Sequence, residues 1–290
     1  MAKDVVSRLA DSLWRAAAYC LHPVVIVLSF MPVLIMGAAA WFLARFYWED
    51  ALDAVMGWEI IKQINNLLAG IGLAKLHTLV GQLVVVMLAT PVIVVGSLLL
   101  VTAMMAPWMV KLVARRRFPA LEKLRGGTIV GSVFHALWVT AVAAVVLVVS
   151  MPLWLIPPLI LILPPVIWGW LTYRVMSYDV LADHATRQER REIVRAHRWT
   201  LLGMGVLSGY VSMLPSMVWG IGAALIYAPF VIMAAIWIYT LVFAFTGLWF
   251  GHYLLSALAD LREFHAREAK TRQEALPPAI DVPIEVLPLP

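Results

Sequence analysis

The sequence predicts an all-α integral membrane protein, with two long transmembrane helices, two proline-broken helical hairpins and amphipathic interfacial helices. Of its 290 residues, 63% are hydrophobic and 13% are charged. A typical soluble domain is about 45–50% apolar and about 25% charged. The charges also gather in a few short stretches between long apolar runs. Such runs need lipid as their solvent, since a soluble protein of this composition would lack a charged surface.

Four apolar stretches are long enough to cross a bilayer, which takes about 20 helical residues. Residues 24–44, 78–110 and 199–251 contain no Asp, Glu, Lys, Arg or His, and residues 126–173 contain only His135. The first two fit single spans, which we place at 24–46 and 78–110. The other two are too long for one span, and we expect hairpins over 128–173 and 199–255.

Prolines mark the expected bends of both hairpins, because a proline inside a helix removes one backbone hydrogen bond. Backbone groups freed in this way cannot face lipid. Two arrangements therefore stay open: ordinary interfacial turns between full spans, or re-entrant hairpins whose breaks line a water-filled pathway. The prolines expected to break the helices are Pro157, Pro158, Pro165, Pro215 and Pro229.

Two polar segments have the pattern of helices that lie in the membrane interface. Residues 3–21 place apolar side chains on one helical face and charged ones on the other. Residues 49–77 repeat this pattern with four acidic and two basic side chains, which favours the non-cytoplasmic side. The acidic residues are Glu49, Asp50, Asp53 and Glu59.

Basic residues predict the orientation of the chain. The segments 111–125 and 174–198 carry most of the surplus behind the net charge of +5, and such loops face the cytoplasm. Both termini then lie in the cytoplasm, and nucleic acid is not an expected partner. Residues 1–265 form a single membrane domain, and we expect residues 266–290, proline-rich from Leu276, to be a disordered cytoplasmic tail.

The apolar stretches contain no acidic side chain and the chain carries no standard catalytic motif, so we expect neither an enzyme nor a metal or cofactor site. His135 and His252 are the ionisable residues nearest the spans. Two interpretations remain for them: neutral histidines bonded to a neighbour, or a relay or ligand.

Two groups of residues are candidates for anion binding. Arg187, Arg191, Arg195 and Arg198 have a helical spacing that predicts a positive ridge. Such a ridge attracts anions or anionic lipid head groups, or it is simply a solvated cytoplasmic face. Arg15, His22 and Pro23 precede the first span, where an anion can meet hydrogen-bond donors at a membrane entrance.

Several short elements together resemble a known family, from about Leu21 to about Trp249. The elements are Pro23 with Met31-Pro32, Met105-Ala106-Pro107-Trp108, Ile156-Pro157, Pro165-Val166-Ile167-Trp168, Asp179 with Asp183-His184, Leu214-Pro215 and Ala228-Pro229. Their order and spacing are similar to those of the etoposide-induced-protein family, which includes the CysZ sulfate permeases. The stretch Leu21-His22-Pro23 carries no arginine where sulfate-binding members of that family have one.

This resemblance implies a multi-pass protein of the bacterial inner membrane that assembles as a homo-oligomer and passes sulfate. The function we predict is transport or channel activity for a small inorganic anion such as sulfate, without ATP. The alternative is a membrane scaffold or lipid-interacting protein that does not transport. The lipid bilayer is a partner in either case.

Overall fold

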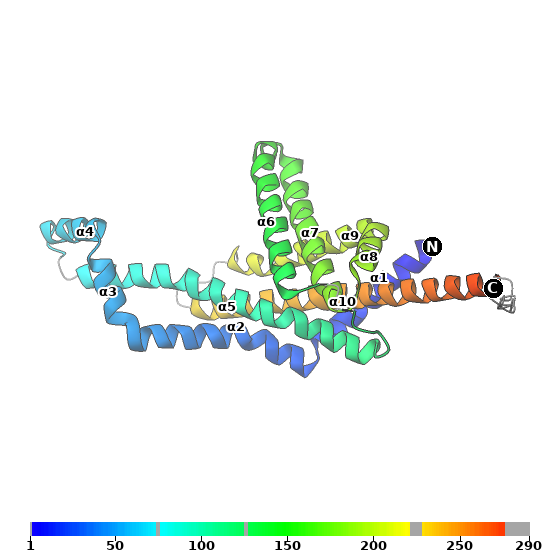
Figure 1. Ribbon diagram of the computed structural model, residues 1–290. Helices are drawn as coiled ribbons and strands as arrows, with labels where there is room; N and C mark the ends of the chain where they lie inside the picture. The colour runs from blue at the N-terminus through cyan, green and yellow to red at the C-terminus, as the bar shows by residue number, and fades with distance from the viewer. Residues whose placement is uncertain (1, 74–75, 125–126, 221–227, 276–290) are drawn as a thin grey trace, which may run out of the picture.

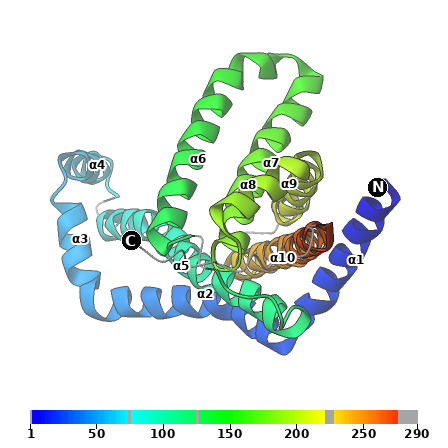
Figure 2. The ribbon, with the colours of Figure 1, turned by 45° about the vertical axis from the view of Figure 1, so that its right-hand side comes forward.

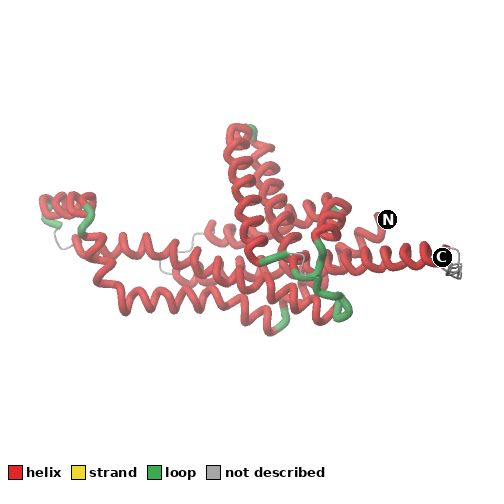
Figure 3. Tube along the Cα trace, in the orientation of Figure 1, coloured by secondary structure: helices red, strands yellow, loops and turns green. Residues whose placement is uncertain are grey.

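The computed structural model describes residues 2–73, 76–124, 127–220 and 228–275, and every regular element in these ranges is a helix (Figures 1 and 3). Five helical stretches are long and apolar enough to cross a membrane: 23–56, 78–117, 130–155, 157–182 and 233–274. The prediction of an all-α membrane protein is therefore confirmed. In chain order the elements are α1 (Ala2–Cys20), α2 (Pro23–Phe42), η1 (Leu43–Tyr47), α3 (Trp48–Met56), α4 (Glu59–Gly70), α5 (His77–Arg117), α6 (Ile129–Ser150), η3 (Met151–Leu155), α7 (Pro157–Ala182), α8 (Arg187–Ala196), α9 (Arg198–Gly220) and α10 (Ala228–Ala275).

The long helices form two groups that point in different directions. Helices α2, α5 and α10 run alongside one another, while the α6–α7 hairpin stands out steeply from them (Figures 1 and 2). Helix α4 lies at the far end of the α2–α5 pair. Helix α10 packs against α1, α2, α5, α7 and α9, so it is the central element of the described fold.

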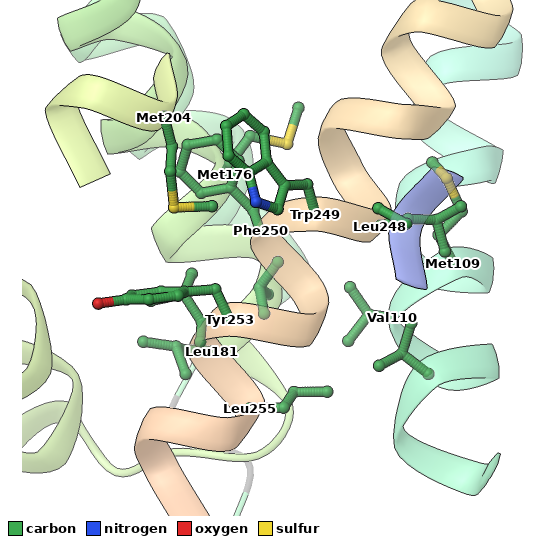
Figure 4. Close-up of a cluster of buried hydrophobic side chains, with 14 of the residues drawn as sticks. Met109, Val110, Met176, Leu181, Met204, Leu248, Trp249, Phe250, Tyr253 and Leu255 are labelled. Carbon is green, nitrogen blue, oxygen red and sulfur yellow. The ribbon is translucent and has the colours of Figure 1, made fainter. Parts of the chain in front are cut away.

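The hydrophobic core is built around the middle of α10. Trp249, Phe250 and Tyr253 are almost fully buried there, with side chains of α5, α7 and α9 around them (Figure 4). Because an aromatic side chain buries about 150–250 Å², these three rings anchor the other helices to α10. Most exposed apolar side chains lie on α2, α5, α6 and α7, where lipid is their natural solvent.

The first expected span is longer than its predicted range of 24–46. The π-helix η1 joins α2 to α3 with no loop between them, so the helical stretch continues to Met56, although the chain bends sharply at η1 (Figures 1 and 2). The predicted segment 49–77 contains two helices, because α3 ends at Met56 and α4 begins at Glu59. Likewise α5 runs to Arg117 and α7 to Ala182, so both predicted basic segments begin inside helices.

Only some of the prolines interrupt a helix. Pro157 and Pro158 are the first residues of α7, where a backbone N–H group would make no hydrogen bond within the helix, so proline costs nothing there. Pro229 is the second residue of α10, while residues 221–227 lie outside the described ranges. The expected breaks at Pro165 and Pro215 are wrong, because α7 and α9 continue through them.

Helices α7 and α9 approach closely where both carry glycine. A Cβ atom added to Gly205 would lie 2.2 Å from the carbonyl oxygen of Gly169, and one added to Gly169 would lie 2.6 Å from the backbone nitrogen of Val206. Gly205 and Gly209 form a G-x-x-x-G pattern on α9, which lets two helix backbones pack together in a membrane. This close contact joins α7 to α9, and α7 also packs against α10.

The beginning of the expected disordered tail is helical. Helix α10 continues to Ala275, so the prediction of disorder over 266–275 is wrong. Residues 266–275 are rich in Ala, Glu, Lys and Arg, which favour helix, and Lys270–Glu274 is an ion pair at a spacing of four. The proline-rich part of the expected tail, residues 276–290, lies outside the described ranges.

Candidate anion site

The three residues expected at the membrane entrance do not form one open binding site. His22 caps α2, since its Nδ1 accepts a hydrogen bond of 3.2 Å from the backbone N–H of Val24. Pro23 is the first residue of that helix, the position where proline is best tolerated. Arg15 points instead to Asp11, one turn earlier on α1, and its Nε lies 2.8 Å from a carboxylate oxygen.

Arg117, at the end of α5, joins Arg15 on the same carboxylate. Its Nη2 lies 2.7 Å from Oδ2 of Asp11, so one acid lies between two guanidinium groups. Arg117 Nη1 lies 3.4 Å from Nδ1 of His252 on α10, and Tyr19 packs its ring edge-on against that imidazole. Helices α1, α5 and α10 thus meet in one polar cluster, which we call the Arg117 cluster: Asp11, Arg15, Tyr19, Arg117 and His252.

The Arg117 cluster carries a positive surplus. Burial raises the pKa of Asp11, but hydrogen bonds from Arg15 and Arg117 outweigh it and hold this pKa below its ordinary value of 3.8. The carboxylate is therefore ionised and balances only one of the two arginines. The residual charge is the first property required of an anion site.

His252 adds a donor to this cluster. Arginine can only donate, so Nδ1 of His252 must accept from Arg117, and the ring proton then lies on Nε2. His252 is fully buried and its Nε2 has no hydrogen-bond partner among the described residues. A buried N–H group without an acceptor is unusual.

An open cavity of about 660 Å³ lies beside Arg117, between the loop after α5 and the far part of α10. Arg262, the other arginine in its wall, is already engaged: it bonds the Glu189 carboxylate at 2.8 Å and the carbonyl of His184 at 2.6 Å. Arg117 is therefore the wall arginine whose charge is only partly balanced. The lining residues are Arg117, Phe118, Pro119, Ala120, Leu121, Glu122, Leu124, Glu189, Ala259, Arg262 and His265.

The candidate hairpin prolines are not part of this site. Pro157 and Pro158 are exposed at the start of α7, and Pro165 is buried between α7 and α9. None of these three lines the cavity. The side chains of Pro215 and Pro229 lie outside what the structure describes.

The predicted arginine ridge is split between two helices. Arg187, Arg191 and Arg195 are exposed along α8, but His197 ends that helix with non-helical backbone angles. Arg198 opens α9, and its guanidinium lies 5.2 Å from the centre of the Trp199 ring. The expectation of one ridge of four is therefore wrong, and the ridge comprises the three arginines of α8.

The fold and the Arg117 cluster together define a multi-pass helical membrane protein with a basic cluster where α1, α5 and α10 meet. The chain belongs to the family of the sulfate transporter CysZ and etoposide-induced protein 2.4, whose model matches residues 12–221. The match begins one residue after Asp11, includes Arg15 and Arg117, and ends before α10. No curated protein and no solved structure matches the chain.

Sequence reasoning missed the role of Arg117. It lies in a run of three arginines after an apolar span, which by itself indicates only a cytoplasmic boundary. Its partners Asp11 and His252 are 106 and 135 residues away in the chain. Only the packing of α1 and α10 beside α5 brings the three together.

Proposed function

We propose that this protein transports a small inorganic anion, with sulfate as its representative substrate. It would act as a homo-oligomer in the bacterial inner membrane, with both termini in the cytoplasm, without ATP and without a catalytic reaction. Membership of the sulfate transporter family supports a transport role. The observation that supports an anion as the substrate is the Arg117 cluster, where two guanidinium groups share one carboxylate beside an open cavity.

The proposed role of this cluster is anion exchange at Arg117. An oxyanion that enters the cavity competes with Asp11 for the planar donor fork of Arg117, which suits sulfate because it binds two oxygens at once. The exposed arginines of α8 raise the local anion concentration. Asp11 then holds Arg117 in place between transport events and keeps it from being an unpaired charge.

The alternative is a membrane scaffold that does not transport. It is supported by the structural roles that Arg15, His22 and Pro23 already have. Arg15 pairs with Asp11, and His22 and Pro23 begin α2. In that case the Arg117 cluster only docks α1 onto α5 and α10.

Uptake measurements on the full chain in liposomes distinguish the two. Transport predicts uptake of radiolabelled sulfate above that of protein-free vesicles, and at least about a ten-fold lower rate for Arg117→Gln, which removes one charged hydrogen bond. Arg267→Gln is the matched control, because Arg267 is an exposed arginine whose guanidinium, among the described residues, pairs with Glu263 of its own helix. Uptake equal to protein-free vesicles for both sulfate and chloride would support the scaffold.

A further inference from the structure

A second basic cluster lies at the base of the α6–α7 hairpin, away from the Arg117 cluster. The guanidinium of Arg190 on α8 lies 4.2 Å from the centre of the Tyr178 ring on α7. The imidazole of His135 on α6 stacks on the same tyrosine, with ring centres 4.5 Å apart and 20° between their planes. Arg174, one turn before Tyr178, lies within electrostatic reach of His135, as Arg190 does. Three helices thus converge on one small region.

Both arginines of this cluster have buried donors without an acceptor. Nε of Arg174 and Nη1 of Arg190 are shielded from solvent and have no hydrogen-bond partner in the part of the chain that the structure describes. Neither arginine forms an ion pair within those residues. Leaving a buried polar group unsatisfied is unfavourable, and more so when the group is charged.

The neighbouring acidic side chains are engaged elsewhere. Glu189, next to Arg190 in the chain, accepts two hydrogen bonds from Arg262. Asp179 accepts a hydrogen bond from Ser132, and the charge of Asp183 interacts electrostatically with His184. Two cations therefore remain without a counter-charge among the described residues, which is the arrangement expected where a ligand supplies the negative charge.

We propose that Arg174 and Arg190 bind an oxyanion, a phosphate or sulfate group, with His135 and Tyr178 as the walls of the site. Planar guanidinium groups match the oxygens of such a group, and arginine is the usual residue for this recognition. The site is separate from the Arg117 cluster, so it does not depend on the transport proposal.

Two sources can supply this oxyanion. One is the phosphate of an anionic phospholipid, whose acyl chains would lie along the exposed apolar stripe of Val130, Phe134 and Trp138 on α6. These residues are spaced by four and share a face of that helix. The other is a free inorganic anion. Both present the same oxygens to the arginines, and an experiment can tell them apart.

Binding to purified full-length protein in detergent tests the proposal in two arms. The first arm counts retained short-chain phosphatidylglycerol, with phosphatidylcholine as reference, by native mass spectrometry, and the second titrates inorganic phosphate and sulfate by calorimetry. The double variant Arg174→Gln/Arg190→Gln should bind at least about ten-fold more weakly, since two charged hydrogen-bonding groups are removed. The control Arg267→Gln/Arg272→Gln removes the same charge from the exposed end of α10 and should change affinity little.

Each outcome decides the proposal. Loss restricted to phosphatidylglycerol identifies a lipid head group, and loss of phosphate or sulfate binding identifies a free anion. Arg117→Gln should retain the binding at this site. If the wild type binds neither ligand, or the double variant and the control lose affinity equally, the proposal is wrong. If the double variant does not fold, Arg190→Lys and Arg174→Lys replace it: they keep the charge but lose the donor fork, and unchanged affinity in both would contradict the site.

Discussion

The hydroxyl of Tyr210 on α9 donates a hydrogen bond of 3.0 Å to the carbonyl oxygen of Leu161 on α7. Leu161 lies four residues before Pro165, so its carbonyl lacks the helical N–H that any other residue at 165 would supply. A neighbouring helix thus provides the donor that the proline removed. This explains why α7 continues through Pro165 at a position where an unsatisfied carbonyl would be costly in lipid.

Replacing Tyr210 by Phe should therefore destabilise the fold through this one bond. We expect Tyr210→Phe to lower the free energy of unfolding by about 0.5–1.5 kcal/mol, measured by denaturant unfolding in detergent. In a Pro165→Ala background the restored N–H serves Leu161, so the same change should cost close to nothing. Tyr239→Phe, at a partly exposed tyrosine of α10, is the control. An equal loss in both backgrounds would contradict the explanation.

The crossing of α7 and α9 should not accept a side chain at Gly205. A Cβ atom there would meet the backbone oxygen of Gly169 at 2.2 Å, and backbone cannot move aside as a flexible side chain can. We expect Gly205→Ala to cost at least about 1–3 kcal/mol and to lower the melting temperature. Gly203→Ala is the matched control on the same helix, because nothing lies within 4 Å of an added Cβ. Similar melting temperatures for the two variants would contradict a tight backbone contact at Gly205.

The sequence was sufficient for the fold class because hydrophobicity and charge report directly on the solvent of each segment. It also placed the break at Pro157, where proline opens a helix. It failed at Pro165, since tolerance of that proline depends on a hydroxyl 49 residues away on another helix. The linear sequence does not show which residue of another helix completes a backbone hydrogen bond.

The candidate site was predicted only in part, for the same reason. The position of Arg15 before the first span predicts an anion ligand, and Arg15 does belong to the Arg117 cluster. The net charge of this cluster and the contacts of Arg15 depend on Asp11, Arg117 and His252, which no local sequence pattern connects. Charge spacing on α8 predicted the exposed face correctly up to Arg195, but the helix end at His197 depends on local backbone geometry.

Arg262 should contribute more to stability than any exposed arginine of α10. It joins α10 to α8 through Glu189, and it also donates to the backbone carbonyls of His184 and Glu122. We expect Arg262→Gln to lower the free energy of unfolding by about 2 kcal/mol, because it leaves a mostly buried carboxylate without its charged partner. The control is Arg267→Gln, further along the same helix, which should cost less than about 0.5 kcal/mol. Indistinguishable unfolding curves for the two variants would rule out this role.

The pairing of Glu189 also predicts an acid-dependent loss of stability. Burial raises the pKa of Glu189, but hydrogen bonds from Arg262 and from Thr186 outweigh it, so this pKa lies below its ordinary value of 4.5. A carboxyl group with a lowered pKa in the folded state stabilises the fold above its unfolded pKa, and this contribution disappears as the pH falls through the folded value. Glu189→Gln should therefore be less stable than the wild type at neutral pH, and the difference should shrink as the pH falls below 4.5. Unfolding midpoints measured over that pH range test this, with Glu263→Gln as an exposed control that should track the wild type throughout. A difference between wild type and Glu189→Gln that stays constant into acid would mean that the Glu189 charge does not stabilise the fold.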